Sequence, residues 1–327
     1  MNNTTNFENL QVLCDVGRDG RVRPWKEHKM ANELLSLAYQ EIDESKAARL
    51  RECATWLSYR KENSGVLKLS RANFCRVRLC PVCQWRRSLK AFGQTTKIIK
   101  AYESEKQHSY AMLTLTAKNC TADELSTVID NLMAAWGRLT RRTPWLKVVL
   151  GWYRGLEVTH NTDPMSAAYD TYHPHFHVLL AFRKSYFTSR YYLPQAEWAR
   201  LWRESLRCDY DPIVDIRKCR PDSTGSLAAA TAEVTKYSTK SGDFIIPDDW
   251  DLTVETVRTL DKALNKRRFI AFGGELGELH RKLNLSDPEE GDLVHIDDEN
   301  EECGEPAPEF MYFWYSGYRQ YMGGNKI

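Results

Sequence analysis

The 327-residue chain lacks a long hydrophobic run: no stretch of about 18 apolar residues occurs, so no membrane-spanning helix is expected. Its first residues contain neither a basic region nor an apolar segment, which argues against a secretory signal. Nine cysteines without such a signal favour a reducing compartment over a disulfide framework. We therefore expect a cytoplasmic protein without a membrane partner.

The chain also lacks internal repeats and a glycine-rich phosphate-binding loop, so no ATP-driven activity is expected. Positive charge is missing from one segment: between Asp287 and Glu309, eleven residues are acidic and none is Lys or Arg. Because the net charge of the whole chain is +2, the other 304 residues carry +13. A basic body with an acidic segment favours a polyanionic partner, although the segment can equally be a solubilising linker.

Histidines are concentrated at one place, where His173, His175 and His177 alternate with other residues before the apolar run 178–182. The pattern predicts a buried β-strand, and alternate side chains of a strand share a face. His175 and His177 should therefore point the same way. Two neighbouring imidazoles suit a divalent metal ion, whereas two ordinary strand histidines are the alternative.

A carboxylate on the preceding predicted strand, residues 151–159, can complete this site. Glu157 faces away from its two apolar neighbours in that strand. If the two strands pair, Glu157 and the histidine pair form a ligand set that suits Mn²⁺ or Mg²⁺. His160 and His173 are alternative ligands, and Glu157 can also be a plain carboxylate at a strand edge.

A predicted helix further along the chain carries a tyrosine beside a carboxylate. Good helix formers at 227–232 precede Glu233 and Tyr237, which lie four residues apart and would share one helix face. Lys236 and Lys240 lie close by. Such a tyrosine can act as an activated nucleophile with an acid–base partner. A solvated helix with a tyrosine packed at its edge is the alternative.

Four cysteines predict a structural zinc site. Cys80 and Cys83 form a Cys-x2-Cys turn, Cys75 precedes it by five residues, and Cys53 begins a predicted β-hairpin over 53–71. Four thiolates close a tetrahedron around Zn²⁺ without an open position. Cys303 and Cys14 are the alternatives to Cys53 as fourth ligand, and a set of buried free thiols is the alternative to zinc.

Basic residues crowd this predicted zinc module. Between Arg60 and Lys90 there are nine Lys and Arg residues and one acid. A rigid module followed by a basic helix favours contact with DNA, although a solvated helix face is the alternative. The candidate DNA-contacting residues are Arg76, Arg78, Arg86, Arg87 and Lys90.

The order of predicted elements from 110 to 243 is strand, helix, strand, strand, helix, strand, helix. This order is typical of an α+β fold with a largely antiparallel sheet. A further helical region is expected at 251–285. The expected divisions are an N-terminal helical region (1–50), a zinc-binding module (51–105), a central domain (106–245), a C-terminal helical region (246–286), an acidic linker (287–309) and an aromatic tail (310–327).

Motifs in this order resemble a known family. The segment from Ala72 to Lys90, the strand Leu113–Thr116, the histidine segment Tyr172–Val178 and the segment Glu233–Ser238 carry the resemblance. The chain resembles the replication initiators of small rolling-circle bacterial plasmids, which use one tyrosine and belong to the HUH endonuclease superfamily. The resemblance implies a central antiparallel sheet flanked by helices, with an inserted N-terminal zinc module and a C-terminal helical region.

The resemblance also implies a mechanism. The histidine pair and Glu157 would hold Mn²⁺ or Mg²⁺ at a scissile phosphate, and Tyr237 would attack to leave a 5′-phosphotyrosyl link and a free 3′-hydroxyl. Glu233 matches the glutamate that activates water for the terminating cleavage. The spacing of Lys240 suggests that it neutralises phosphate charge or positions the phenol.

The implied partners are plasmid origin DNA, as a single-stranded nick site with flanking duplex, and a host helicase and DNA polymerase. A homodimer is left open. Three other functions remain alternatives: an HUH transposase or relaxase, a zinc-containing DNA-binding regulator without nicking activity, and a phosphodiesterase in which water is the nucleophile.

Overall fold

The computed structural model describes residues 10–17, 20–61, 67–220, 227–235, 240–296 and 308–326. The chain divides into two compact units. The first unit contains Met1–Arg86 and Asp292–Ile327, and the second contains Arg87–Gly291. The boundary falls inside one helix, α3 (Pro81–Glu105), a position that the predicted segments did not mark.

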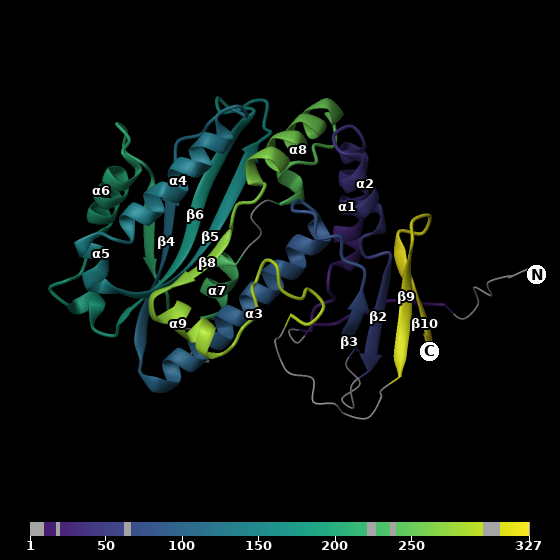
Figure 1. Ribbon diagram of the computed structural model, residues 1–327, viewed down its shortest axis with the longest axis horizontal. Coiled ribbons are helices and arrows are strands. Elements are labelled where there is room, and N and C mark those ends of the chain that lie inside the picture. The colour runs from purple at the N-terminus through teal and green to yellow at the C-terminus, as the bar shows by residue number, and fades with distance from the viewer. Residues whose placement is uncertain are drawn as a thin grey trace, which may run out of the picture. The chain divides into compact units, whose positions relative to one another are not determined.

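The first unit is built on an antiparallel sheet in the order β1-β10-β9-β2-β3. The C-terminal aromatic segment enters this sheet, because Leu57 of β2 pairs with Tyr312 of β9 (Figure 1). The predicted hairpin after Cys53 is formed by β2 and β3. The strands are β1 (Gln11–Val12), β2 (Trp56–Lys61), β3 (Leu67–Ala72), β9 (Glu309–Tyr315) and β10 (Gln320–Lys326).

The expected N-terminal helical region contains two helices, which lie between β1 and β2 in the chain. They are α1 (Trp25–Gln40) and α2 (Glu44–Glu52). The break is specified locally, because the side chain of Asp43 accepts a hydrogen bond from the Lys46 amide at 3.1 Å. An Asp in this position satisfies an amide that has no partner within the helix, and so begins a new helix.

The second unit contains a five-stranded antiparallel sheet in the order β7-β4-β6-β5-β8. The α+β class and the antiparallel pairing are therefore confirmed, although the described residues form two sheets instead of one. The strands are β4 (His108–Thr116), β5 (Val149–Asn161), β6 (Thr171–Arg183), β7 (Val214–Lys218) and β8 (Ile270–Gly273).

The sequence pattern predicted a helical region at 251–285, but this region is not helical throughout. It contains α8 (Trp250–Leu264), then the edge strand β8, then α9 (Gly274–Lys282). Gly273 and Gly274 permit this arrangement, because neither position has room for a Cβ. A Cβ on Gly273 would lie 2.2 Å from the Trp152 ring, and a Cβ on Gly274 would lie 2.2 Å from the Leu150 carbonyl oxygen. Close contact with β5 thus selects a strand that the residue pattern alone did not indicate.

Tryptophan and phenylalanine side chains fill one face of the second sheet. Trp136 of α4 contacts both Trp152 of β5 and Phe176 of β6, with ring centroids 4.8 and 5.7 Å apart. Trp202 of α6 lies 6.4 Å from Phe176 and donates its indole N–H to the Thr116 carbonyl oxygen. The helices on this side are α4 (Leu125–Leu139), α5 (Thr143–Val148) and α6 (Gln195–Leu206).

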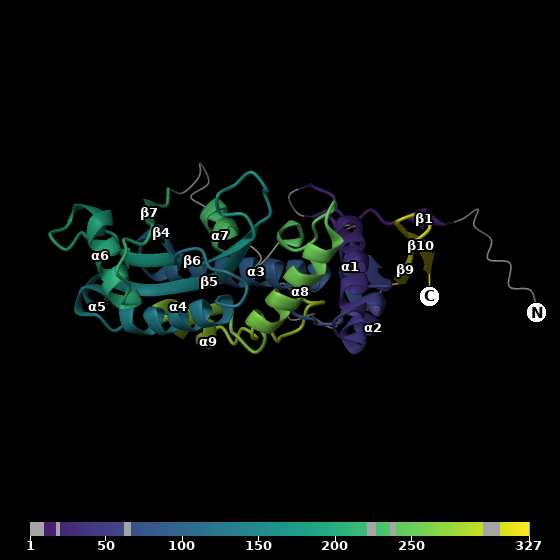
Figure 2. The same cartoon turned by 90° about the horizontal axis from the view of Figure 1, so that it is seen from above.

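The opposite face packs against α3, α9 and α7 (Ala228–Val234). Tyr153 and Leu179 of the sheet join Ile98 of α3, Val234 of α7 and Leu276 of α9 in one buried cluster. Figure 2 shows α7 and α4 on opposite sides of the strands. Among the helices of the described residues, none has both the length and the apolar composition needed to cross a membrane.

The basic face expected on the helix after the cysteine turn is not exposed. Arg86, Arg87 and Lys90 are 1%, 7% and 0% exposed. Arg86 donates to the carbonyl oxygens of Leu293 and Val294 at 2.8 Å each, and Arg87 donates to the Glu289 carbonyl oxygen at 3.1 Å. The interpretation of these three residues as a DNA-contacting face is therefore wrong for this conformation, whereas Arg76 is exposed and Arg78 is half-buried.

Replacing Arg86 by Met should lower the free energy of unfolding by about 1–3 kcal/mol, because two carbonyl groups lose a charged hydrogen-bond donor. Urea denaturation measures this change. The matched control is Arg258→Met, which removes an exposed arginine that pairs with Glu255 three residues away, and should change stability by less than about 1 kcal/mol. Unchanged stability of the Arg86 variant, together with weaker DNA binding, would restore the DNA-contact interpretation.

Candidate metal sites and the face that carries them

The register of β5 and β6 brings one carboxylate and two imidazoles together. Glu157 pairs with His175, and Gly155 pairs with His177, so the side chains of Glu157, His175 and His177 lie on the same face of the sheet. Glu157 Oε2 lies 3.0 Å from His177 Nε2 and 3.6 Å from His175 Nε2. The two Nε2 atoms are 3.2 Å apart. The predicted ligand atoms therefore converge on one point.

Each histidine of this triad is oriented through its other ring nitrogen. His175 Nδ1 lies 3.0 Å from the His173 carbonyl oxygen, and His177 Nδ1 lies 3.4 Å from Thr114 Oγ1. A bond from Nδ1–H to the carbonyl leaves Nε2 of His175 able to bind a metal ion, which is the usual arrangement of ligating histidines. The donor set therefore fits a divalent cation.

The charge state of Glu157 also suits a cation. Burial tends to raise the pKa of this carboxyl group, but hydrogen bonds to His175 and His177 and their charge outweigh burial. The net result is a pKa well below the usual range. Glu157 is therefore ionised, and its buried negative charge favours a positive partner.

The two alternative histidines do not join the triad. His160 lies on the opposite face of β5, stacks on Tyr172 at 4.4 Å, and contacts Asp170 through Nε2 at 2.9 Å. His173 stacks on His175 at 5.1 Å and supplies its carbonyl oxygen. Burial and the neighbouring His175 lower the pKa of His173, so this ring stays neutral beside the site.

The predicted catalytic residues around Tyr237 are placed only in part. Glu233 lies near the end of α7 and is half-buried. Lys240 is 53% exposed at its side chain, and its Nζ lies 3.4 Å from Glu157 Oε1. Tyr237 itself, with Lys236, lies outside the described residues. The structure therefore brings Lys240 to the triad and leaves the position of Tyr237 a prediction.

Gly155, which the sequence reading missed, holds the end of α7 against the triad strand. A Cβ on Gly155 would lie 2.9 Å from the Val234 carbonyl oxygen, closer than real Cβ atoms approach such an atom. The Thr235 carbonyl oxygen accepts a hydrogen bond from Ser88 Oγ of α3 at 2.6 Å. Thr235, the last described residue before the tyrosine segment 236–239, is thus fixed beside Gly155, which pairs with His177.

The four predicted cysteine ligands form a second cluster, in the first unit. Cys53 Sγ lies 3.6 Å from Cys80 Sγ and 3.7 Å from Cys83 Sγ, and Cys75 Sγ lies 3.8 Å from Cys83 Sγ. A tetrahedral zinc ion with Zn–S bonds of about 2.3 Å places its sulfurs about 3.8 Å apart. Cys14 is exposed and lies outside this cluster, and Cys303 lies outside the described residues.

Backbone amides point at the cysteine sulfurs, as expected for thiolates. Arg76 N–H donates to Cys83 Sγ at 3.3 Å, and Cys75 N–H donates to Cys53 Sγ at 3.4 Å. The φ angle of 58° at Arg76 is in the left-handed region and belongs to this turn. The arrangement satisfies acceptors that would be costly if left unpaired in a buried site.

Lys29 and Asn32 of α1 lie behind the cluster and were also missed. Lys29 is 1% exposed, its pKa is lowered by burial, and its Nζ donates to the Cys53 carbonyl oxygen at 2.7 Å. The Asn32 side chain accepts from Cys80 Sγ at 3.1 Å and donates to the Leu50 carbonyl oxygen. The sequence contains a signal for them, because both polar residues recur at helical spacing on the same face of α1 as the buried Trp25 and Tyr39.

Comparison with known proteins adds an independent line of argument. A family model described as "Replication protein" matches residues 66–322. The chain belongs to this replication protein family. The match includes three of the four clustered cysteines, the whole Glu-His-His triad and the tyrosine segment. The resemblance inferred from the motifs is therefore confirmed at the level of the family.

Several relatives cover nearly the whole chain, and others cover about two thirds of it. "Protein rep" of Bacillus amyloliquefaciens is 37% identical over 337 aligned positions, which cover 95% of this chain and 97% of the relative. "Protein rep" of Streptococcus pneumoniae is 34% identical, with 97% of each chain covered. A "Replication protein" of Staphylococcus aureus is 33% identical over 63% of this chain and 86% of its own length. No solved structure matches.

Adding a side chain at Gly155 should loosen α7 from the sheet. Gly155→Ala forces a Cβ onto the Val234 carbonyl, so we expect a loss of about 1–3 kcal/mol of stability and faster amide exchange in 228–235. Hydrogen exchange with mass spectrometry measures the second effect.

Gly137→Ala is the control for this variant. A Cβ at Gly137 in α4 meets only the end of Arg141, at 3.9 Å, and alanine in a helix should stabilise by about 0.5–1 kcal/mol. Unchanged exchange in α7 of the Gly155 variant would show that this contact does not hold the helix.

Proposed function

We propose that this replication protein starts rolling-circle replication of a plasmid by nicking one strand of the origin. The observation that carries the proposal is the convergence of Glu157, His175 and His177 beside Lys240 and the end of α7. This face brings together three possible ligands of a divalent ion, the positively charged Lys240, and the residues on both sides of the tyrosine segment 236–239. Origin DNA, exposed as a single strand at the nick site, is the proposed substrate.

The triad would hold Mn²⁺ or Mg²⁺, and both ions suit one carboxylate with two imidazoles and open positions. Such an ion supplies charge neutralisation and orientation at a scissile phosphate. The protein contributes a rigid frame for it, because all three ligands lie on two central strands and each imidazole is oriented through its Nδ1. These are the requirements of phosphoryl transfer, in which positioning and electrostatics dominate.

Tyr237 is the proposed nucleophile. Its phenolic oxygen would form a bond to phosphorus while the bond to the 3′-oxygen breaks, giving a 5′-phosphotyrosyl link and a 3′-hydroxyl for a polymerase to extend. The support for this role is the family membership together with the anchoring of Thr235 and Lys240, which flank the segment, beside the triad. Lys240 would neutralise phosphate charge during the attack.

Glu233 is proposed to activate water for the cleavage that ends replication. A water-driven second cut releases the product without a second tyrosine. Its position on α7, half-buried and one turn before the tyrosine segment, is compatible with a base that acts on the same phosphate.

The cysteine cluster is proposed to hold a structural Zn²⁺. Four thiolates with one Zn²⁺ carry a net charge of about −2, and the buried ammonium of Lys29 beside them offsets part of this charge. Arg76 and Arg78, which follow Cys75, stay the proposed DNA contacts of this module. A host helicase and DNA polymerase are the proposed further partners.

Replacing Tyr237 by Phe should abolish nicking and keep DNA binding, because only the attacking oxygen is removed. The measurement is covalent capture. The purified protein is incubated with Mn²⁺ and single-stranded oligonucleotides that tile its own replicon, and denaturation-resistant adducts are mapped by mass spectrometry. An adduct on Tyr237 identifies both the nucleophile and the nick site.

Glu233→Ala is the contrast variant in this assay. It should make the first cut at a normal rate and accumulate the covalent adduct. Full nicking by the Tyr237→Phe protein would refute the proposed nucleophile and favour water instead. Adduct formation at a transposon end or a transfer origin, but not at the replication origin, would favour a transposase or relaxase.

Replacing Cys80 by Ser should reduce zinc from about one ion per chain to near zero and lower thermal stability, because zinc binding is coupled to folding. Elemental analysis of the purified protein measures the metal. Cys14→Ser, which changes an exposed cysteine outside the cluster, should keep both zinc and stability. A full complement of zinc in the Cys80 variant would exclude the cluster as its site.

A further inference from the structure

The loop that joins β6 to α6 presents aromatic and basic side chains together. We call residues 183–194 the aromatic–basic loop. Tyr191 and Tyr192 are 49% and 45% exposed, although tyrosine rings usually bury most of their surface. Arg183, Lys184 and Arg190 are exposed among them. Neither the triad nor the cysteine cluster uses this surface.

The loop has a rigid base within the second unit. Tyr186 is 3% exposed and stacks on Phe182 of β6, with ring centroids 4.0 Å apart and an interplanar angle of 4°. The Tyr186 hydroxyl accepts a hydrogen bond from the Leu193 amide at 3.2 Å. Ser189 Oγ donates to the Tyr186 carbonyl oxygen and accepts from the Tyr191 amide. The exposed rings therefore stand on a preformed support.

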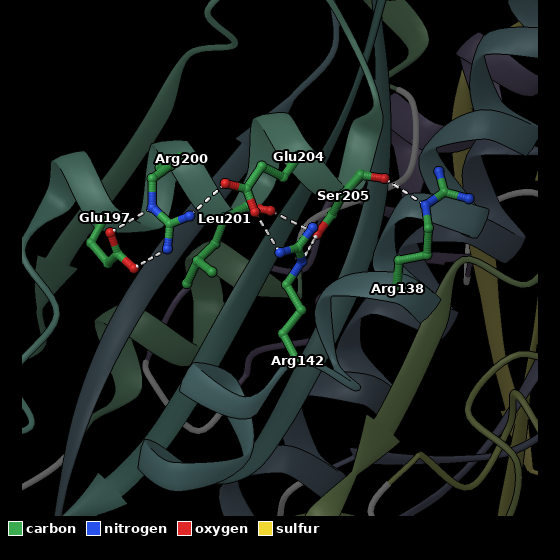
Figure 3. A network of polar contacts seen from close by, with 7 residues as sticks. All are labelled: Arg138, Arg142, Glu197, Arg200, Leu201, Glu204 and Ser205. Atoms are coloured by element: carbon green, nitrogen blue, oxygen red, sulfur yellow. Dashed lines mark hydrogen bonds and ion pairs between the residues drawn. The ribbon is translucent and has the colours of Figure 1, made fainter.

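The far end of the loop is fixed by α6, whose polar contacts are drawn in Figure 3. Arg138 donates to the Ser205 carbonyl oxygen at 2.6 Å, and Arg142 donates to Ser205 Oγ at 2.8 Å. Arg142 also pairs with Glu204 at 2.6 Å. Since Trp198 and Trp202 of α6 are fully buried as well, the loop is held between two anchored elements.

The electrostatic surroundings of the loop favour an anion. No Asp or Glu occurs between Asp170 and Glu197. The nearest acid along the chain, Glu197, pairs with Arg200, which also pairs with Glu204 (Figure 3). In the part of the chain that the structure describes, neither Arg183 nor Lys184 forms an ion pair, so their charges are available to a partner.

Two cation–ring contacts place positive charge directly on the aromatic surface. The Arg190 guanidinium lies 4.9 Å from the centre of the Tyr191 ring and donates to its hydroxyl. Lys218 Nζ, from the edge strand β7, lies 4.8 Å from the centre of the Phe187 ring. Flat rings interleaved with cations are the surface on which unpaired bases stack while phosphates meet positive charge.

We propose that the aromatic–basic loop binds single-stranded DNA, with bases stacked on Tyr191 and Tyr192 and phosphates held by Arg183, Lys184 and Arg190. A duplex hides its base faces, so the exposed rings select a single strand. The loop follows β6, the β-strand that carries His175, and Arg183 lies about 26 Å from His175 at the rise of an extended strand. The loop would be a second contact for the DNA strand that the triad would cut, so this inference rests on the proposed function and deepens it.

The test is binding of fluorescently labelled dT20 to the full-length protein, measured by anisotropy without added divalent metal. Tyr191→Ala/Tyr192→Ala should weaken binding about tenfold or more, because two stacking surfaces are lost. Tyr191→Phe/Tyr192→Phe keeps both rings and should bind like the unchanged protein. Tyr318→Ala removes a ring that is 66% exposed in the first unit, and should also have no effect.

The charge contribution is measured separately by salt titration. Lys184→Ala/Arg190→Ala should lower the slope of log affinity against log salt by about 1.4, since each phosphate contact on a single strand contributes about 0.7. Unchanged dT20 affinity in the double alanine variant would overturn the proposal. So would an equal loss of affinity for a duplex of the same length, which indicates a general electrostatic surface.

Failure of the loop proposal can be distinguished from failure of the proposed nicking function. Binding of dT20 needs neither Tyr237 nor the triad, so a Tyr237→Phe protein should bind it normally. If that variant still nicks while the loop variants lose dT20 binding, the nucleophile is wrong and the loop proposal stands. If the loop variants bind normally while Tyr237→Phe fails to nick, only the loop proposal falls.

Discussion

The pairing register of β5 and β6 is the constraint on which the proposed active site depends. Glu157 opposes His175 only in this register, and a slip by one residue would turn every side chain of one strand to the other face. The register is held from behind, where Leu156 and Phe176 are fully or almost fully buried in the tryptophan-rich layer. Hydrophobic burial on one face thus specifies the polar chemistry on the other.

Buried basic side chains are a second feature on which this structure depends. Lys29, Arg86 and Lys90 are at most 1% exposed, and the first two donate to backbone carbonyl oxygens. A buried cation is costly unless its donors are satisfied, so Lys29 and Arg86 each fix the segment that accepts their hydrogen bonds. Arg86 thereby ties residues 293–294 to the beginning of α3, although more than 200 residues separate them in sequence. A high content of basic residues in this segment therefore reflects architecture and does not by itself indicate contact with DNA.

Much of the fold and of both clusters could be predicted from local sequence, because alternation in a strand and Cys-x2-Cys spacing are local signals. The choice of Cys53 over Cys14, and of Glu157 as partner of His175, agrees with the clusters that the structure forms. The burial of Arg86 could not be predicted, because its acceptors are distant in sequence. The same limit explains the missed strand β8, which is selected by contact with β5, and the missed role of Gly155, which depends on where Val234 packs.

Lys240 and Gly155 show how the active face is assembled from elements that are weak alone. The segment 228–240 contains only one short helix among its described residues, and short helices owe their stability to packing. Contacts that hold its described residues include Val234 against Gly155, Thr235 with Ser88, and Lys240 with Glu157. The contact of Lys240 differs from the others, because Glu157 is also a proposed metal ligand. A cation at the triad would compete with Lys240 for the charge of Glu157, so metal binding would act on the contact that holds Lys240. A metal ion at the triad would therefore weaken the hold on the Lys240 ammonium, which in the proposed mechanism neutralises phosphate charge.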